Sequence, residues 1–109
     1  MILEHALLDV DPARAGEYEA AFHKALPLIT ATPGFLDLTL SPCVEKPGRY
    51  LLLVKWETLE NHTVDFRGSD RYQQWKALLH AFYKPFPEVT HFATPVASKA
   101  GFPPVRETS

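Results

Sequence analysis

The chain has few of the residues that form disulfides, metal sites or contacts with polyanions. Its 109 residues contain a single cysteine, Cys43, so no disulfide can form within the chain. The five histidines do not combine with this cysteine at the spacing of a zinc site, and no phosphate loop is present. The 11 basic residues form no run and are outnumbered by 13 acidic ones, which argues against a nucleic-acid partner. We therefore predict that the protein binds no metal, no other cofactor and no nucleic acid.

Signals for membrane insertion or export are also missing. No apolar run approaches the roughly 18 residues that a membrane span requires. The N-terminal residues M-I-L-E-H-A lack the basic start of a signal peptide. These absences predict a cytoplasmic protein with no membrane partner.

The composition is that of an ordinary globular domain. Hydrophobic residues make up 46% of the chain and charged residues 22%. The length suits one domain with a core of its own. We predict a single domain over residues 1–96, followed by a C-terminal tail over 97–109 that has little of its own to pack.

The first half of the chain predicts a strand, a helix and a second strand. The first strand covers Ile2–Leu8, and Asp11 followed by Pro12 is a typical helix start. Apolar residues then recur at helical spacing, namely Ala15, Tyr18, Phe22, Ala25, Leu26 and Ile29. The alternation in Phe35–Leu40 predicts a half-buried strand. Its inward residues are expected to be Leu36, Leu38 and Leu40.

The second half predicts a similar set of elements. A turn at residues 46–48 leads into a strand over Tyr50–Trp56. Thr58 and Ser69 are suitable N-caps for a short helix and a longer one. The longer helix carries an apolar stripe made of Tyr72, Trp75, Leu79 and Phe82. A last strand is expected over Val89–Val96.

This order of elements, β-α-β-β-α-β, predicts an α+β ferredoxin-like fold: an antiparallel four-stranded sheet with both helices on one face. Residues 51–54 read L-L-L-V, whereas a strand with one wet face should alternate with polar residues. Both faces of this strand are therefore expected to be buried. We predict a homodimer that packs through the sheet face. The alternative is that the C-terminal tail covers this face.

Five segments of the chain resemble a known family. They are T-P-G-F-L (Thr32–Leu36), Y-L-L-L-V-K-W-E (Tyr50–Glu57), His62, S-D-R-Y-Q-Q-W (Ser69–Trp75) and P-F-P-E-V-T-H-F (Pro85–Phe92). Over residues 1 to 96 the chain is similar to the antibiotic biosynthesis monooxygenase-like family of dimeric α/β barrel proteins with ferredoxin-like topology. The resemblance implies a dimeric α/β barrel. It also implies one of several activities, because the family includes cofactor-free oxygenases of aromatic polyketides and quinols, haem-degrading enzymes and proteins of unknown role.

The resemblance assigns roles to individual residues. In the polyketide-oxidising members a Trp ends the third strand and lines the pocket, and Trp56 holds that place here. A Tyr follows shortly afterwards in those members, where this chain has His62. An Asn of their third strand corresponds to Leu52, so one polar pocket group is missing.

The haem-degrading members give a poorer match. They need an Asn on the first strand, a Trp on the second helical segment and a His that binds iron. In this chain those positions fall near Leu7 or Leu8, at Phe66 and near Lys76. Three departures out of three argue against haem degradation.

His62 is the first candidate for a catalytic group, because an imidazole titrates near neutral pH and can take a proton from a phenol. It can equally cap its short helix. Trp56 and Tyr72 are expected to line or polarise the pocket, although most buried Trp residues are plain core. Candidate substrate-binding residues are Tyr18, Phe22, Phe66, Trp75, Leu79 and Phe82, and the same set also suits core packing.

The leading hypothesis is a cofactor-independent monooxygenase that oxidises a small aromatic or quinol-type compound with O₂. Its expected ligand is small and apolar or aromatic. The alternative is a non-catalytic dimer of the same fold, either a small-molecule binder or a stress-type protein.

Overall fold

The computed structural model describes residues 1–98 and contains the six main elements in the predicted order. They are β1 (Ile2–Asp9), α1 (Ala15–Thr30), β2 (Phe35–Pro42), β3 (Arg49–Trp56), α2 (Asp70–Leu79) and β4 (Val89–Phe92). Three short helical segments join them, namely η1 (Pro12–Arg14), η2 (Asn61–Phe66) and η3 (His80–Phe82). Residues 97 and 98 are the only part of the predicted C-terminal tail that lies within the described residues.

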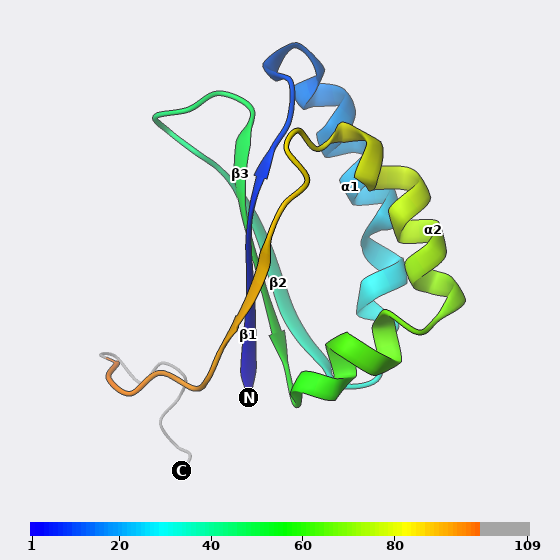
Figure 1. The fold of residues 1–109 in the computed structure, drawn as a ribbon, viewed down its shortest axis with the longest axis vertical. Helices are drawn as coiled ribbons and strands as arrows, with labels where there is room; N and C mark the ends of the chain where they lie inside the picture. The colour runs from blue at the N-terminus through cyan, green and yellow to red at the C-terminus, as the bar shows by residue number, and fades with distance from the viewer. Residues whose placement is uncertain (99–109) are drawn as a thin grey trace.

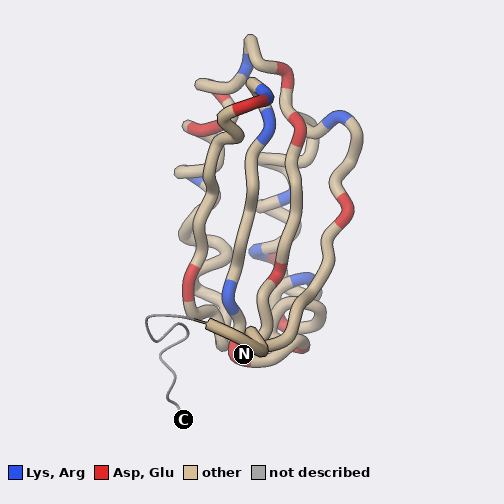
Figure 2. The backbone as a smooth tube through the Cα atoms, turned by 90° about the vertical axis from the view of Figure 1, so that its left-hand side faces the viewer, with Lys and Arg blue, Asp and Glu red and all other residues tan. Residues whose placement is uncertain are grey.

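The strands form one antiparallel sheet in the order β2-β3-β1-β4. Both long helices cover the same face of this sheet, and within residues 1–98 the opposite face carries no helix (Figure 1). Figure 2 views that opposite face, with the four strands running side by side. The predicted α+β ferredoxin-like fold is confirmed.

Strand β3 lies between β2 and β1 and shows a strict alternation of burial. The side chains that face the helices are buried, namely Tyr50, Leu52, Val54 and Trp56. Leu51, Leu53 and Lys55 face the other way and are half-buried. On that outer face Leu53 is paired with His5 of β1 and Thr39 of β2, so apolar and polar side chains are mixed there.

Two sequence-based predictions about the strands are wrong. Leu36 does not share the inward face with Leu38 and Leu40, because a bulge between Phe35 and Asp37 shifts the register and leaves Leu36 47% exposed. The last strand ends at Phe92 rather than Val96. Phe92 is paired with Leu3, and β1 begins at Ile2, so β1 offers only this one further residue for an extended β4 to pair with.

The predicted helix starts differ in detail. Ser69 caps α2 as expected, since its Oγ accepts a hydrogen bond from the Tyr72 N–H at 3.2 Å. Asp11 caps η1 rather than α1, accepting from the Ala13 N–H at 3.0 Å. The short helix after Thr58 contains a π-helical segment, η2, and Thr58 Oγ1 accepts from the Asn61 N–H at 3.3 Å.

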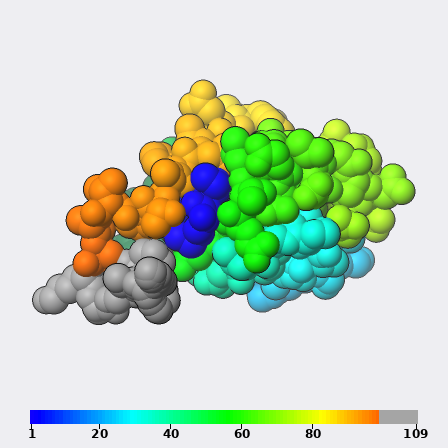
Figure 3. Space-filling view, turned by 90° about the horizontal axis from the view of Figure 1, so that it is seen from below, coloured from blue at the N-terminus to red at the C-terminus, as the bar shows by residue number. Residues whose placement is uncertain are grey.

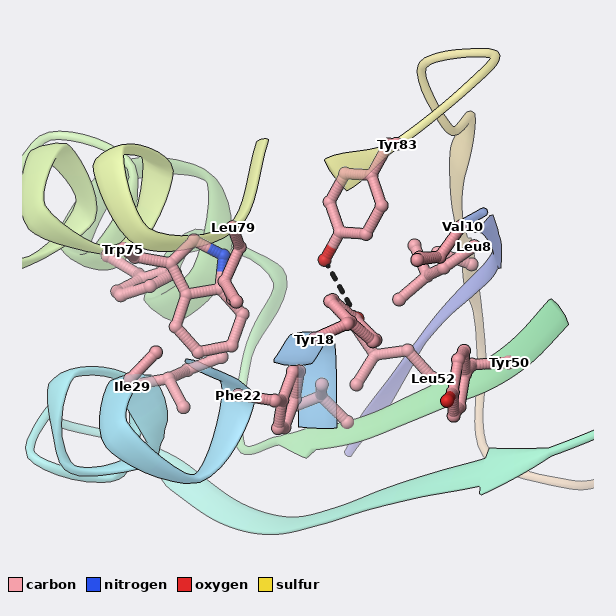
Figure 4. Packing of buried hydrophobic residues seen from close by; sticks show 14 of the residues in the cluster. Leu8, Val10, Tyr18, Phe22, Ile29, Tyr50, Leu52, Trp75, Leu79 and Tyr83 are labelled. Atoms are coloured by element: carbon pink, nitrogen blue, oxygen red, sulfur yellow. Dashed lines mark hydrogen bonds between the residues drawn. The ribbon is translucent and has the colours of Figure 1, made fainter. Parts of the chain in front are cut away.

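The core fills the space between the sheet and the two helices (Figure 4). Tyr18 of α1 lies at its centre and is fully buried. Its hydroxyl is 3.0 Å from the hydroxyl of Tyr83, and burial raises the pKa of both phenols. This hydrogen bond ties α1 to the segment that follows η3, which leads into β4.

Replacing Gly48 by Ala tests the turn before β3. Gly48 has a φ of +86°, and an added Cβ would collide with the backbone carbonyl of Val10. We expect Gly48→Ala to lower the free energy of unfolding by more than about 1 kcal/mol. Gly16→Ala is the control: an added Cβ meets nothing within 4 Å there, and Ala favours a helix by about 0.5–1 kcal/mol. Urea unfolding measures both variants. Equal stabilities would contradict this account of the turn.

Candidate functional site

A cleft of about 90 Å³ lies between the inner face of the sheet and the second helical region. Polar and titratable side chains reach it from several elements, namely Glu4, His62, Arg67, Tyr72, His80 and Tyr83. Its apolar walls include Ala6, Leu8, Leu52, Phe66 and Trp75. The cleft therefore combines aromatic walls with a carboxyl group and two imidazoles.

Glu4 is a charged-type residue on the inner face of β1. The side chains at Glu4, Ala6 and Leu8 all point toward the helices, and Glu4 is only 5% exposed. The buried Trp56 indole donates its Nε1–H to Glu4 Oε1 at 3.0 Å. The indole N–H thus finds its hydrogen-bond partner within the protein.

His62 approaches the same carboxyl group from η2. This segment is a π-helix, in which a backbone N–H donates to the carbonyl five residues earlier. Here the Arg67 N–H donates to the His62 carbonyl at 3.1 Å. The His62 imidazole is 3% exposed and stacks on Trp56 with 16° between the ring planes. Its Nε2 lies 3.4 Å from Glu4 Oε1.

His91 of β4 completes this group of side chains. It is paired with Glu4 across the β1–β4 ladder, and its Nε2 lies 2.8 Å from His62 Nδ1. The start of β1 reaches the surface between η2 and β4 (Figure 3). Three segments far apart in the chain therefore bring Glu4, His62 and His91 together.

Burial governs the protonation of these three groups. It raises the pKa of the Glu4 carboxyl, an effect opposed by the Trp56 hydrogen bond and the positive charge of Arg67. It lowers the pKa of His62 to about 3, and Arg67 and His91 contribute to the same direction. The pKa of His91 is also lowered, by burial and by Arg67. Both imidazoles are therefore neutral at neutral pH.

The predicted site residues do not all lie at one site. His62, Phe66, Tyr72 and Trp75 line the cleft. Trp56 lies behind it and contacts it through Glu4, while Tyr18 and Leu79 are fully buried in the core.

Phe22 lines a second cleft between α1 and β2, of about 220 Å³. Phe82 lies in η3, where the Arg14 guanidinium is 4.5 Å from its ring centroid.

Sequence reasoning missed Glu4 and His91. A signal for Glu4 was available, because it shares the alternation phase of Ala6 and Leu8 and so had to point inward. His91 had no such signal, since its approach to His62 depends on the strand order. Leu52 is apolar, as expected, and lines the same cleft as Glu4 of the neighbouring strand β1, so the cleft contains a polar group from another position.

Residues 1–98 contain neither a metal-binding cluster nor a membrane-spanning helix. Within that range no group of three or more His, Cys, Asp or Glu side chains is arranged to hold a metal ion. None of the helices there combines the length and apolar character that crossing a membrane demands.

Comparison with known proteins identifies the family. The model of the family described as antibiotic biosynthesis monooxygenase matches residues 1–78. The chain belongs to this family. This confirms the resemblance drawn from the sequence.

Three relatives indicate how close the similarity is. The chain is 52% identical over 92 residues to the uncharacterized protein YczJ of Bacillus subtilis strain 168, covering 84% of this chain and 97% of that one. A candidate antibiotic biosynthesis monooxygenase from Bordetella bronchiseptica is 37% identical, with a TM-score of 0.81 and coverage of 87% and 97%. SnoaB, a cofactor-independent oxygenase from Streptomyces nogalater, is 18% identical with a TM-score of 0.75 and coverage of 91% and 96%, which shows the shared fold alone.

The neutral state of buried His62 predicts acid sensitivity. The unfolded chain binds a proton at His62 below about pH 6.5, whereas the folded protein does so only near pH 3. The folded state should therefore lose up to about 1.4 kcal/mol per pH unit as the pH falls through this window. The raised pKa of Glu4 acts in the opposite direction above about pH 4.5.

We expect His62→Gln to flatten the dependence of the unfolding free energy on pH between 6.5 and 4.5. Urea unfolding at a series of pH values measures the slope, which is independent of any constant loss caused by the substitution. His23→Gln, on the exposed side of α1, is the control and should keep the wild-type slope. Identical slopes for His62→Gln and wild type would refute a buried, neutral His62.

Proposed function

We propose that this protein is a cofactor-independent monooxygenase that oxidises a small aromatic or quinol-type compound with O₂. The observation that carries the proposal is the cleft, in which a neutral imidazole and a carboxyl group face walls made of Phe66, Tyr72 and Trp75. Membership of the antibiotic biosynthesis monooxygenase family supports it. A relative of the same fold is described as a cofactor-independent oxygenase.

Oxidation without a cofactor needs an electron-rich substrate anion, because O₂ in its triplet ground state reacts by single-electron steps. His62 acts as the base that removes the phenolic proton. Its Nδ1 is committed to His91 at 2.8 Å, whereas Nε2 lies 3.4 Å from Glu4, beyond the 2.7–3.2 Å of a good hydrogen bond. Nε2 is therefore the ring nitrogen that a substrate hydroxyl can approach.

The other predicted residues hold and polarise the substrate. The Tyr72 side chain lines the cleft and offers a hydroxyl to a developing oxyanion. Trp56 acts through Glu4, whose Oε1 it holds by a hydrogen bond. Phe66 and Trp75 supply flat apolar walls, and their rings meet edge to face with centroids 5.6 Å apart.

The size of the cleft restricts the substrate. Ligand pockets commonly have volumes of about 300–1,000 Å³, and a cavity of about 150 Å³ holds benzene. The cleft here measures about 90 Å³. The proposed substrate is therefore a single-ring compound, whose entry moves the cleft walls outward, and not a fused polycyclic one.

The same small volume favours a second candidate function. The interior is largely filled by aromatic rings, and Tyr18, Phe66 and Trp56 are each no more than 2% exposed. A filled interior suits a dimeric protein that binds a small molecule without transforming it, or that acts through its assembly. This alternative differs from the oxygenase in needing no base.

We further propose that two copies of the chain associate through the outer face of the sheet, forming a dimeric α/β barrel. On this face Leu7 is 46% exposed and Phe92 is 53% exposed, next to half-buried Leu51 and Leu53. Exposed and half-buried apolar side chains on such a sheet face favour an interface. Proteins of the family are typically dimeric, which supports the same assembly.

Incubation of the purified protein with a panel of single-ring hydroquinones and phenols, in air and under argon, tests the activity. We expect product only in air, and a loss of about 10²–10⁴-fold in kcat for His62→Gln, because that is the usual contribution of a general base. The control is His23→Gln, which should behave as wild type. Ligand binding with no oxidation in air would favour the non-catalytic alternative.

Light scattering coupled to size-exclusion chromatography tests the dimer. Leu53→Arg places a charge in the middle of the outer sheet face and is expected to convert the dimer to a monomer. Val64→Arg is the matched control, since Val64 lies in η2 and is 60% exposed. A wild-type chain that elutes as a monomer would refute the interface.

A further inference from the structure

Glu4, His62 and His91 form a continuous line from the cleft to the edge of the sheet. Glu4 and His62 line the cleft. The next contact joins His62 Nδ1 to His91 Nε2 at 2.8 Å. His91 lies on β4, an edge strand, and is half-buried, whereas the other two side chains are buried. One end of the line is thus in the cleft and the other is close to solvent.

We infer that these three side chains are a proton relay, in which His62 passes the proton it takes from the substrate through His91 to solvent while Glu4 stabilises the charged ring. The inference rests on the proposed oxygenase function. It adds two residues to that function: Glu4, which lies beside the reacting nitrogen, and His91, which acts through His62.

The burial of His62 explains why a relay is required. A buried imidazole strongly resists carrying a positive charge, as its lowered pKa indicates. A proton that arrives at Nε2 therefore cannot remain on the ring through a catalytic cycle. His91 lies within hydrogen-bond distance of the opposite nitrogen and can accept the second proton at once. Glu4 Oε1, 3.4 Å from Nε2, lies close enough to stabilise positive charge on the ring during the transfer.

The proton balance is simple. The substrate O–H bond breaks and a new N–H bond forms at His62 Nε2. The N–H bond at His62 Nδ1 then breaks as His91 Nε2 gains a proton, and His91 releases its Nδ1 proton to water. The substrate anion that remains gives one electron to O₂, and the resulting radical pair combines at a ring carbon as a peroxide anion, which takes up a proton. Loss of water from this hydroperoxide leaves a carbonyl group on that carbon, so one oxygen atom enters the product and the other leaves as water. Proton exchange with solvent along the line restores the starting tautomers of His62 and His91.

Other charged or titratable groups around the cleft do not offer the same route. Arg67 lowers the pKa of both imidazoles, so it favours onward release of the proton. His80 also lines the cleft, but its ring contacts are with Tyr72, Tyr83 and Phe86. His5 precedes Ala6 on β1 and points to the outer face, where its ring meets Phe92.

Chemical rescue tests the relay. We expect His91→Gln, which can still accept a hydrogen bond from Nδ1 but cannot pass on a proton, to lose about 10-fold or more of kcat toward the hydroquinone that the wild type oxidises best. Free imidazole in the buffer should restore the rate of His91→Ala, because the position lies at an exposed edge. His62→Ala, which is buried, should not be rescued in the same way. His23→Gln is the control and should keep the wild-type rate.

Spectroscopy gives an outcome that does not depend on turnover. In ¹⁵N-labelled protein, the His62 Nδ1 signal should shift in His91→Gln and stay unchanged in His23→Gln. A wild-type rate in His91→Gln, or a lost rate that imidazole leaves unchanged, overturns the relay and leaves the oxygenase standing. No oxidation by wild type in air overturns the oxygenase and the relay's catalytic role together. An unmoved His62 signal overturns the hydrogen-bonded pairing itself.

Discussion

A buried carboxyl group organises this structure. Glu4 is the one acidic side chain on the inner face of β1, and burying it without partners would cost several kcal/mol. Its partners come from two other elements: the Trp56 indole at the end of β3 and the His62 imidazole of η2. The stacking of His62 on Trp56 keeps both partners in place. Aromatic side chains line the cleft beside this carboxyl group, so the polar group and the aromatic walls face the same space.

The two faces of the sheet differ in what covers them. Its inner face carries the core and the cleft, with β3 contributing alternate buried residues from Tyr50 to Trp56. Its outer face bears half-buried leucines and an exposed Phe92 without a covering helix. Because side chains alternate along a strand, a substitution on one face leaves the other face in register. The apolar outer face and the cleft on the inner face can therefore be altered separately in this fold.

Local sequence patterns were sufficient to predict most of the fold. The helical stripe of α1 and the Ser69 cap depend on residues close together in the chain, and both are found as predicted. The errors arose where distant segments decide the outcome. The bulge at Leu36 depends on how β2 pairs with β3, and the end of β4 depends on how far β1 extends beside it.

The site was predictable only in part, for the same reason. The selection of His62 and the aromatic wall residues as candidates was possible from the helical segments that carry them. The contact of Glu4 with His91, by contrast, requires β1 and β4 to be neighbours in the sheet. No pattern within either strand indicates that pairing. The volume of the cleft is likewise set by how rings from α1, α2 and β3 pack together, which a list of aromatic residues does not determine.

The wide turn of η2 has an evolutionary consequence. A π-helical turn accommodates one residue more than an α-helical turn, so a single deletion within residues 61–66 would convert it to ordinary helix. That change rotates the preceding part of the segment by about 100° and carries the imidazole away from the carboxyl group. One codon therefore separates a chain that brings this imidazole to the Glu4 carboxyl group from a chain that keeps the scaffold and loses this contact.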